Sequence, residues 1–256
     1  PVLSNMLIAW SAFLEKKWIA KATCFTTVSQ VLSQRISEVH KHKIPGYVIE
    51  NGYDKIRERK TPSNHSEIHF AYTGNVYKVQ DFEQNLVKIA EVAKNYPSVK
   101  TKVSFVGGAF SNQRKKKMQK LCGNINLEFV DYMKKKDLDV FNNQVDVFLM
   151  AAYGSIQGYQ SSKIYYYISM QKPVFLFPSD NDVMDEILTD SGIKINDLNR
   201  IYQAKAKSEE FKVSIASEKY LHKYSREAGT EKLAQIIQKI TSAETNKTTA
   251  ANNIMK

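Results

Sequence analysis

The chain has 256 residues, with 37 lysines and arginines against 26 acidic residues and a formal net charge of +11. A hydrophobic content of 43% excludes intrinsic disorder for most of the chain, and the length suits one large domain or two small ones. No apolar run reaches the roughly 18 residues of a membrane span, and two cysteines exclude a disulfide framework, so we expect a protein of the reducing cytoplasm.

The N-terminal segment, residues 1–54, differs in pattern from the rest of the chain. Its periodicity predicts a helix over 5–22, a strand over 25–28, a helix over 30–41 and a strand over 48–50, followed by a turn at 51–54. Two strands cannot form a sheet with a core of its own. The segment therefore either extends the edge of the next domain or ends a domain whose first part is absent.

From Ile68 onward, short apolar strands alternate with helical patterns. The expected strands are 68–73, 99–106, 125–130, 145–151 and 173–177, and the expected helices are 81–95, 112–121, 136–143, 162–170 and 182–189. This alternation predicts βαβ units, and hence an α/β fold with a doubly wound parallel sheet. A polar connector over 61–66 precedes it, one or two helices over 209–240 follow it, and 241–256 is expected to be a frayed polar tail.

Two residues lie where such a sheet binds ligands, beyond the carboxyl ends of its strands. Gly74 follows the strand 68–73, where a glycine lets a ligand approach the backbone and the next helix offers free N–H groups to an anion. A plain glycine between strand and loop is the alternative. Lys163 begins a later helix, where a cation opposes the helix dipole. A bound phosphate explains that position, and a solvated lysine explains it equally well.

Other chemistries lack their sequence signatures. The histidine pairs His40 and His42, and His65 and His69, have no accompanying carboxylate cluster, so no metal site is expected. The chain contains no G-x-S-x-G nucleophile motif, no G-x-x-x-x-G-K-[ST] loop and no G-x-G-x-x-G, and we expect no cofactor.

The surplus of basic residues suits a nucleic acid, an anionic lipid surface or a phosphorylated small molecule. Part of it lies in two runs, Arg114–Lys117 and Lys134–Lys136, each within a polar helical stretch. Neither run is interleaved with aromatic residues for base stacking. A solvated helix face is therefore the interpretation we favour, and no nucleic-acid partner is expected.

Four short motifs occur together along the chain. They are TTVS at 26–29, VIENGYD at 48–54, YTGN at 72–75 and SKIYYYISMQKP at 162–173. Their order and spacing resemble those of the GT-B glycosyltransferases, most closely the group 1 enzymes of family 4. No single motif is decisive, and the ordered set, which runs over residues 5–240, carries the resemblance.

This resemblance implies a domain plan. Residues 1–54 would be the end of an N-terminal, acceptor-binding Rossmann domain with its hinge at Asn51, Gly52 and Asp54, so the chain would be a fragment of a longer enzyme. Residues 55–202 would bind the nucleotide-sugar donor. Residues 203–240 would be C-terminal helices that pack back across the cleft, and 241–256 a disordered tail.

The resemblance also assigns the donor diphosphate to a group of residues, with departures. Gly74 and Lys163 match the family. The arginine and lysine that clamp the diphosphate in the family fall on Asn75 and Gln80, with Lys78 close by. The charged clamp is therefore absent, and Lys163 and Lys78 are the cations that remain for this role.

Two family glutamates are also replaced. The glutamate that holds the ribose falls on Tyr166, and the glutamate beside the transferred sugar falls on Gly158. A tyrosine can donate one hydrogen bond to a ribose but cannot accept two hydrogen bonds as a carboxylate does. Tyr166 is kept as a donor-binding candidate, and no catalytic residue is assigned.

The resemblance implies a glycosyltransferase that moves a sugar from a nucleotide-diphosphate sugar to a glycan or lipid-linked acceptor in surface polysaccharide biosynthesis. It implies no cofactor, and its partners would be the nucleotide sugar, the acceptor and the inner face of a membrane. The lost charges leave as alternative a non-catalytic relative that binds a nucleotide or glycan or acts as a partner subunit. A sugar-nucleotide epimerase of the same architecture and a nucleic-acid-binding module are weaker alternatives.

Overall fold

The computed structural model describes residues 2–41, 44–58 and 66–254. The chain forms two compact units: unit 1 comprises residues 1–54, 158–160 and 222–256, and unit 2 comprises residues 55–157 and 161–221. The first boundary follows Asp54, the last residue of the expected hinge, and the segment expected over 203–240 is divided between the units. Of the polar connector expected over 61–66, residues 61–65 lie outside the described residues.

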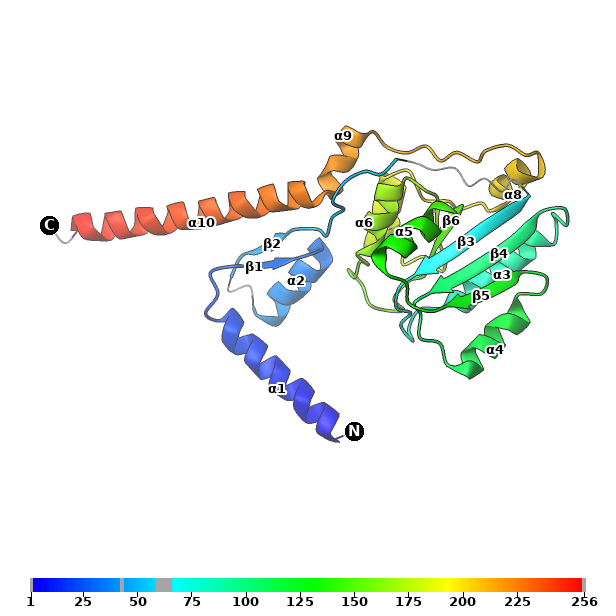
Figure 1. Ribbon diagram of the computed structural model, residues 1–256. Coiled ribbons are helices and arrows are strands. Elements are labelled where there is room, and N and C mark those ends of the chain that lie inside the picture. The colour runs from blue at the N-terminus through cyan, green and yellow to red at the C-terminus, as the bar shows by residue number, and fades with distance from the viewer. Residues whose placement is uncertain (1, 42–43, 59–65, 255–256) are drawn as a thin grey trace. The chain divides into compact units, whose positions relative to one another are not determined.

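Unit 2 is built on a parallel sheet of five strands in the order β5-β4-β3-β6-β7 (Figure 1). The strands are β3 (Glu67–Thr73), β4 (Lys100–Val106), β5 (Asn126–Val130), β6 (Val147–Met150) and β7 (Val174–Leu176). The order reverses between β3 and β6, which confirms the doubly wound parallel sheet expected from the sequence. In such sheets the crevice at this reversal is where ligands bind.

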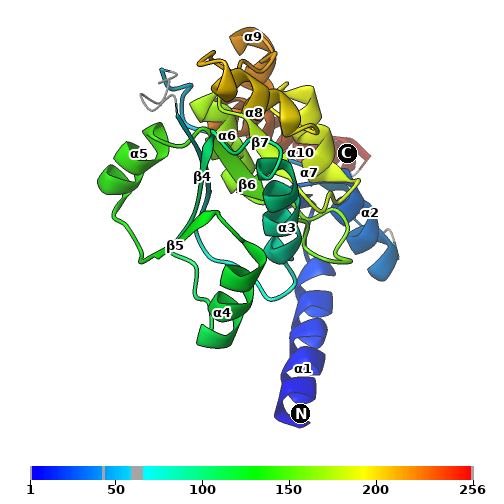
Figure 2. The same ribbon diagram turned by 90° about the vertical axis from the view of Figure 1, so that its right-hand side faces the viewer.

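Helices cover both faces of this sheet (Figures 1 and 2). They are α3 (Phe82–Ala93), α4 (Asn112–Leu121), α5 (Lys135–Asn143), α6 (Lys163–Met170), α7 (Val183–Asp190) and α8 (Asn199–Ala206). On one face α3, α4 and α8 contribute Phe82, Met118 and Tyr202 to the main apolar core. On the other face α6 packs through Tyr167, whose ring stacks on Phe148 with 4.0 Å between centroids.

A polar cluster lies on the second face, beneath α5. A ring nitrogen of His69 lies 2.8 Å from the hydroxyl of Ser104, and the ring meets Phe141 of α5 edge to face. Lys102 pairs with Glu128 at 2.9 Å beside them. Burial, and then the charge of Lys102, lower the pKa of His69 from 6.5 to about 4.

This shifted pKa predicts an acid-sensitive fold. The unfolded chain protonates His69 near pH 6.5 and the folded chain near pH 4, so the stability that His69 contributes above pH 6.5 is lost as the pH falls between those values. We expect urea unfolding to show a loss of about 3 kcal/mol from this group across that window. The variant His69→Gln, which keeps a partner for Ser104, should lose most of that slope. An unchanged slope in the variant would contradict the assignment.

Lys172 is a buried cation, 2% exposed, at the C-terminal end of α5. Its ammonium group donates to the carbonyl oxygens of Asn142 at 2.9 Å, Asn143 at 2.7 Å and Val145 at 2.6 Å. Carbonyls at the end of a helix lack amide partners within that helix and carry its negative pole. Lys172 therefore joins the end of α5 to the segment between α6 and β7.

Unit 1 contains α1 (Val2–Ile19), β1 (Phe25–Thr27), α2 (Gln30–Val39), β2 (Gly46–Val48), the short helix η1 (His222–Tyr224) and α10 (Arg226–Ile254). The strands β1 and β2 pair in parallel as a sheet of their own, so the alternative that this segment extends the edge of the larger sheet is wrong. The side chains of Trp10 and Trp18 on α1 are 61% and 67% exposed. None of the described helices combines the length and the apolar character needed to cross a membrane.

The expected hinge residues lie in unit 1 at the start of α10. Asp54 forms an ion pair with Arg226 at 2.8 Å. A Cβ on Gly52 would lie 2.6 Å from the backbone nitrogen of Arg226, so only glycine fits there, and Asn51 is half-buried next to it. These contacts fix residues 51–54 to unit 1, and unit 2 begins at Lys55.

The C-terminal region differs from the expectation. Residues 209–217, expected as part of a helix, are irregular and lead into the four-residue helix α9 (Glu218–Leu221). Residues 241–254, expected as a frayed tail, continue α10 as far as Ile254. Residues 230–254 contain no glycine or proline, the two residue types that most strongly end a helix.

Candidate functional site

The site is built at the carboxyl ends of neighbouring strands of unit 2. Gly74 follows β3 and Gly107 follows β4, and both adopt a positive φ, of 113° and 76°. A Cβ on Gly107 would lie 3.9 Å from the Cα of Gly74 and 3.9 Å from the Cα of Tyr132, which comes after β5. Backbone therefore lies close to backbone along this edge, and Tyr132 stands beside it with its side chain 85% exposed.

Gly74 and Lys163, which the sequence analysis singled out separately, meet in the structure. A Cβ on Gly74 would lie 2.3 Å from Cε and 3.0 Å from Nζ of Lys163. At such distances the end of the Lys163 side chain would have to move away to make room for any side chain on residue 74. The absence of a Cβ at Gly74 therefore lets the Lys163 ammonium lie over the end of β3.

Lys163 is a cation without a matching carboxylate. Among the described residues it forms no ion pair, and its ammonium lies 5.5 Å from the centre of the Tyr72 ring. Burial lowers the pKa of Lys163 below its ordinary value. Ser162, which precedes α6, makes no side-chain capping bond, and the amides of Lys163 and Ile164 donate to the hydroxyl and the carbonyl of Ser161 at 3.4 and 3.1 Å. A half-buried cation and a helix N-terminus thus occur together, an arrangement that binds anions.

Tyr72 is a site residue that the sequence analysis missed. It is fully buried, its ring lies beneath the Lys163 ammonium, and its hydroxyl donates to the carbonyl of Asn75 at 2.7 Å. This hydrogen bond joins the end of β3 to the loop that follows. Its place two residues before Gly74 was the available signal.

After its first residue, the loop 74–80 contains three of the residues predicted to bind the donor, of which two are exposed and one is buried. Asn75 and Lys78 are exposed. Gln80 is fully buried, where its amide oxygen accepts from the Tyr77 amide at 3.1 Å and its NH₂ group donates to the Ala151 carbonyl at 3.3 Å. Gln80 therefore holds the loop 74–80 against Ala151, which follows β6. Of these three residues, the exposed Asn75 and Lys78 are the ones that a ligand could contact.

Tyr166 lies in a different cluster. Its hydroxyl donates to Asp139 at 2.9 Å and accepts from the Asn142 amide at 2.9 Å. The guanidinium of Arg57 lies 5.0 Å from the centre of its ring and pairs with Asp139 at 2.9 Å. Burial raises the pKa of Tyr166. These contacts join Tyr166 to α5 and to the segment after the hinge, rather than to Gly74 and Lys163.

Gly158, where the family's other glutamate would fall, belongs to unit 1. Its φ is +72°, and a Cβ there would lie 2.8 Å from the Cβ of Val31. The hydroxyl of Ser29 donates to its carbonyl at 2.7 Å. A glutamate at this position would require the backbone or Val31 to move.

The chemistry available at the edge of the sheet is anion binding. Lys163 and the positive pole of α6 supply positive charge, and Gly74 lets the lysine side chain lie close to the backbone at the end of β3. Within the described ranges no three histidine, cysteine or acidic side chains converge as metal ligands would. The geometry therefore suits a phosphate-bearing ligand.

Comparison with known proteins gives a fold. No family model matches the chain, and no curated protein matches it significantly. Several solved structures, in contrast, match its fold. A pneumococcal O-GlcNAc transferase, GtfA, solved with UDP and GlcNAc, superposes with a TM-score of 0.61 at 13% identity, covering 89% of this chain and 47% of GtfA.

Two further structures agree. TarM of S. aureus gives a TM-score of 0.55 at 17% identity, covering 86% of this chain and 45% of TarM. The Anabaena protein HepE, solved with UDP and glucose, gives 0.57 at 13% identity, covering 85% of this chain and 63% of HepE. The chain thus has the fold of the GT-B glycosyltransferases, as the motifs implied, and spans about half the length of GtfA and TarM.

Proposed function

We propose that unit 2 binds the nucleoside diphosphate of a nucleotide sugar and that the protein transfers the sugar to a glycan or lipid-linked acceptor. The observation that carries this proposal is the ammonium of Lys163, which forms no ion pair with the described residues and lies over Gly74 at the N-terminus of α6. The ligand position expected of a doubly wound sheet, beside the reversal of strand order, coincides with these residues.

The proposed reaction is displacement at the anomeric carbon, with the nucleoside diphosphate as leaving group. Negative charge then grows on the phosphate oxygen that leaves the sugar. Lys163, together with the positive pole of α6, would take up that charge in a partly dry environment, where such interactions are strongest. Asn75 and Lys78 would contact the diphosphate from the loop, and Gln80 and Tyr72 would hold that loop in place.

The comparisons bear on the identity of the sugar donor more than on that of the acceptor. GtfA was solved with UDP and GlcNAc, and HepE with UDP and glucose, which favours a uridine nucleotide as first candidate. We propose surface polysaccharide biosynthesis as the setting, in the cytoplasm and at the inner face of a membrane, to which the charge of +11 would attract the protein. Because the chain spans about half of GtfA and TarM, these are proposals for the whole protein.

A second candidate is a relative of these enzymes that binds a nucleotide or glycan without catalysis, or serves as a partner subunit. The contacts of Tyr166 and Gly158 favour it, because the hydroxyl of Tyr166 is engaged by Asp139 and Asn142 and no glutamate fits at Gly158. A neighbouring structure is a complex of two proteins, GtfA/B. Nucleotide binding without transfer by the complete protein would favour this candidate.

The Lys163 assignment predicts a specific loss of binding. We expect Lys163→Ala to weaken UDP binding by about 1–3 kcal/mol, roughly 5- to 150-fold, because a charge-assisted hydrogen bond to phosphate is removed. Isothermal calorimetry on the wild-type chain and the variant measures this. Lys100→Ala, at an exposed lysine that begins β4 and so lies at the opposite end of that strand from Gly107, is the matched control and should leave the affinity unchanged.

Equal affinity of wild type and Lys163→Ala would remove Lys163 from the site.

The pH dependence of UDP binding gives an independent check on Lys163. The charged form of Lys163 is the one that binds an anion, so affinity should fall as the pH rises through its lowered pKa, below the ordinary 10.5 of a lysine. Lys163→Arg, whose charge persists, should remove that fall.

A further inference from the structure

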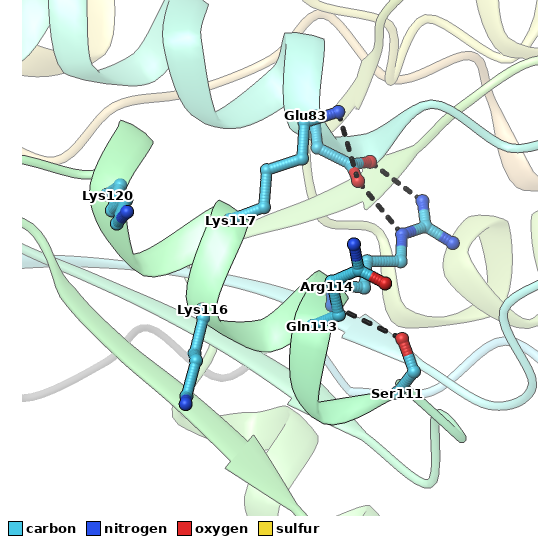
Figure 3. A pocket seen from close by; sticks show the side chains of 7 residues that line it. All are labelled: Glu83, Ser111, Gln113, Arg114, Lys116, Lys117 and Lys120. Carbon is cyan, nitrogen blue, oxygen red and sulfur yellow. Dashed lines mark hydrogen bonds and ion pairs between the residues drawn. The ribbon is translucent and has the colours of Figure 1, made fainter.

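The helix α4 carries an unusual concentration of positive charge. Its ten residues include Arg114, Lys115, Lys116, Lys117 and Lys120 and no acidic residue. Beside it lies an open hollow of about 620 Å³, lined by Glu83, Ser111, Gln113, Arg114, Lys116, Lys117 and Lys120. Figure 3 shows the long side chains of Lys116 and Lys117 leaving the helix in different directions, with Lys117 toward Glu83. The nucleotide-binding proposal does not use this surface.

These cations differ in how they are engaged. Arg114 is engaged through Nε and Nη2, which donate to the two carboxylate oxygens of Glu83 at 3.0 and 2.7 Å, Nη2 also donating to the carbonyl of Gln80 at 2.7 Å. The side chain of Lys117 is 67% exposed, and its ammonium lies 4.0 Å from the Glu83 carboxylate, farther than the 2.7 Å of Arg114. Lys116 and Lys120 are exposed, and neither forms an ion pair with any residue that the structure describes. Three lysines therefore remain for an external anion.

The type of charge indicates the type of partner. The fork of Arg114, which would recognise a single phosphate bidentately, is already paired with Glu83. Exposed lysines are mobile point charges that suit a surface of many anions. The sequence of α4 contains no aromatic residue on which a nucleic-acid base could stack. Its exposed side chains are polar, so the interaction would be electrostatic, without insertion of apolar groups.

We propose that Lys116, Lys117 and Lys120 form a docking surface for an anionic lipid bilayer. This inference rests on the membrane association proposed above and assigns it to one face of unit 2. Each lysine near an anionic surface strengthens partitioning by about fivefold, and three lysines together by about a hundredfold. The attraction is screened by salt, because the Debye length falls from about 10 Å at 0.1 M to about 3 Å at 1 M.

The test is sedimentation of the full chain with vesicles of phosphatidylglycerol and phosphatidylcholine, compared with vesicles of phosphatidylcholine alone. We expect wild type to bind the anionic vesicles, and the triple variant K116A/K117A/K120A to bind them about a hundredfold more weakly. The matched control is K134A/K135A/K136A, which removes the same charge from the other basic run and should retain most of the binding. Thermal melts establish that each variant is folded.

Three outcomes would overturn the proposal: no binding of wild type to anionic vesicles, equal binding to neutral vesicles, or equal losses in the two triple variants. The last would show that total charge, rather than this surface, sets the affinity. Titration of the same variants with UDP separates this proposal from the proposed nucleotide site, because none of the substituted residues belongs to it and UDP affinity should be unchanged.

Discussion

Replacing Gly74 with alanine is expected to lower the affinity for UDP at least about tenfold, and the free energy of unfolding by about 2 kcal/mol. The loss of stability arises because a φ of +113° is strained for any residue with a Cβ. The loss of affinity arises because the new methyl group would lie 2.3 Å from Cε of Lys163 and would displace that flexible side chain. Calorimetric titration and urea unfolding of the same variant measure the two effects.

Gly123→Ala is the matched control for this experiment. Gly123 also has a positive φ, +56°, but a Cβ there would meet no atom within 4 Å. It should therefore cost about 1 kcal/mol of stability, from the left-handed backbone alone, and leave UDP affinity unchanged. If Gly74→Ala kept wild-type affinity, the close approach of Lys163 would have no part in binding.

Replacing Lys172 with methionine is expected to give the largest loss of stability, about 4 kcal/mol. The variant leaves the carbonyls of Asn142, Asn143 and Val145 without the charged donor that they share, in a place that is 2% exposed. Methionine keeps most of the length and bulk of the side chain, so the loss measures the hydrogen bonds more than a cavity. Urea unfolding at neutral pH is the measurement.

Lys94→Met is the control for this second substitution. Lys94 also stands at the C-terminal end of a helix, α3, but it is exposed. Its replacement should change the free energy of unfolding by about 0.5 kcal/mol or less, as is usual for surface positions. Similar losses in the two variants would show that Lys172 contributes only through the helix dipole.

The sheet of unit 2 could be predicted from the sequence because its central strands are buried on both faces and read as continuous apolar runs, as VFLM of β6 does. The helix α4 was predicted with its observed bounds, since Ser111 caps it by accepting from the Arg114 amide and Gly123 follows its end. The short helix α8 was missed, because Leu198 before it makes no capping bond and its buried residues, Ile201, Tyr202 and Lys205, include a lysine, which breaks the apolar pattern.

Long-range contacts limited what could be predicted elsewhere. The second strand of unit 1 was expected over 48–50 but is Gly46–Val48, because it pairs with β1 in a register that sets Gly46 opposite Phe25. The contact of Gly74 with Lys163 joins residues 89 positions apart (163 − 74), which no local pattern reveals. Equally, nothing near Gln80 signals the buried carbonyl of Ala151 that holds it.

The central claim is that this chain holds a nucleoside diphosphate at Lys163 and Gly74. The most direct test is a thermal-shift and calorimetric titration of the full chain with UDP, GDP, ADP and TDP, and with their sugars. A ligand at about 100 times its dissociation constant should stabilise the fold by about 2.7 kcal/mol. We predict selective stabilisation by one nucleoside diphosphate, with UDP the first candidate, and its loss in Lys163→Ala. A folded chain whose melting temperature and heat signal stay unchanged across all of these ligands would contradict the claim.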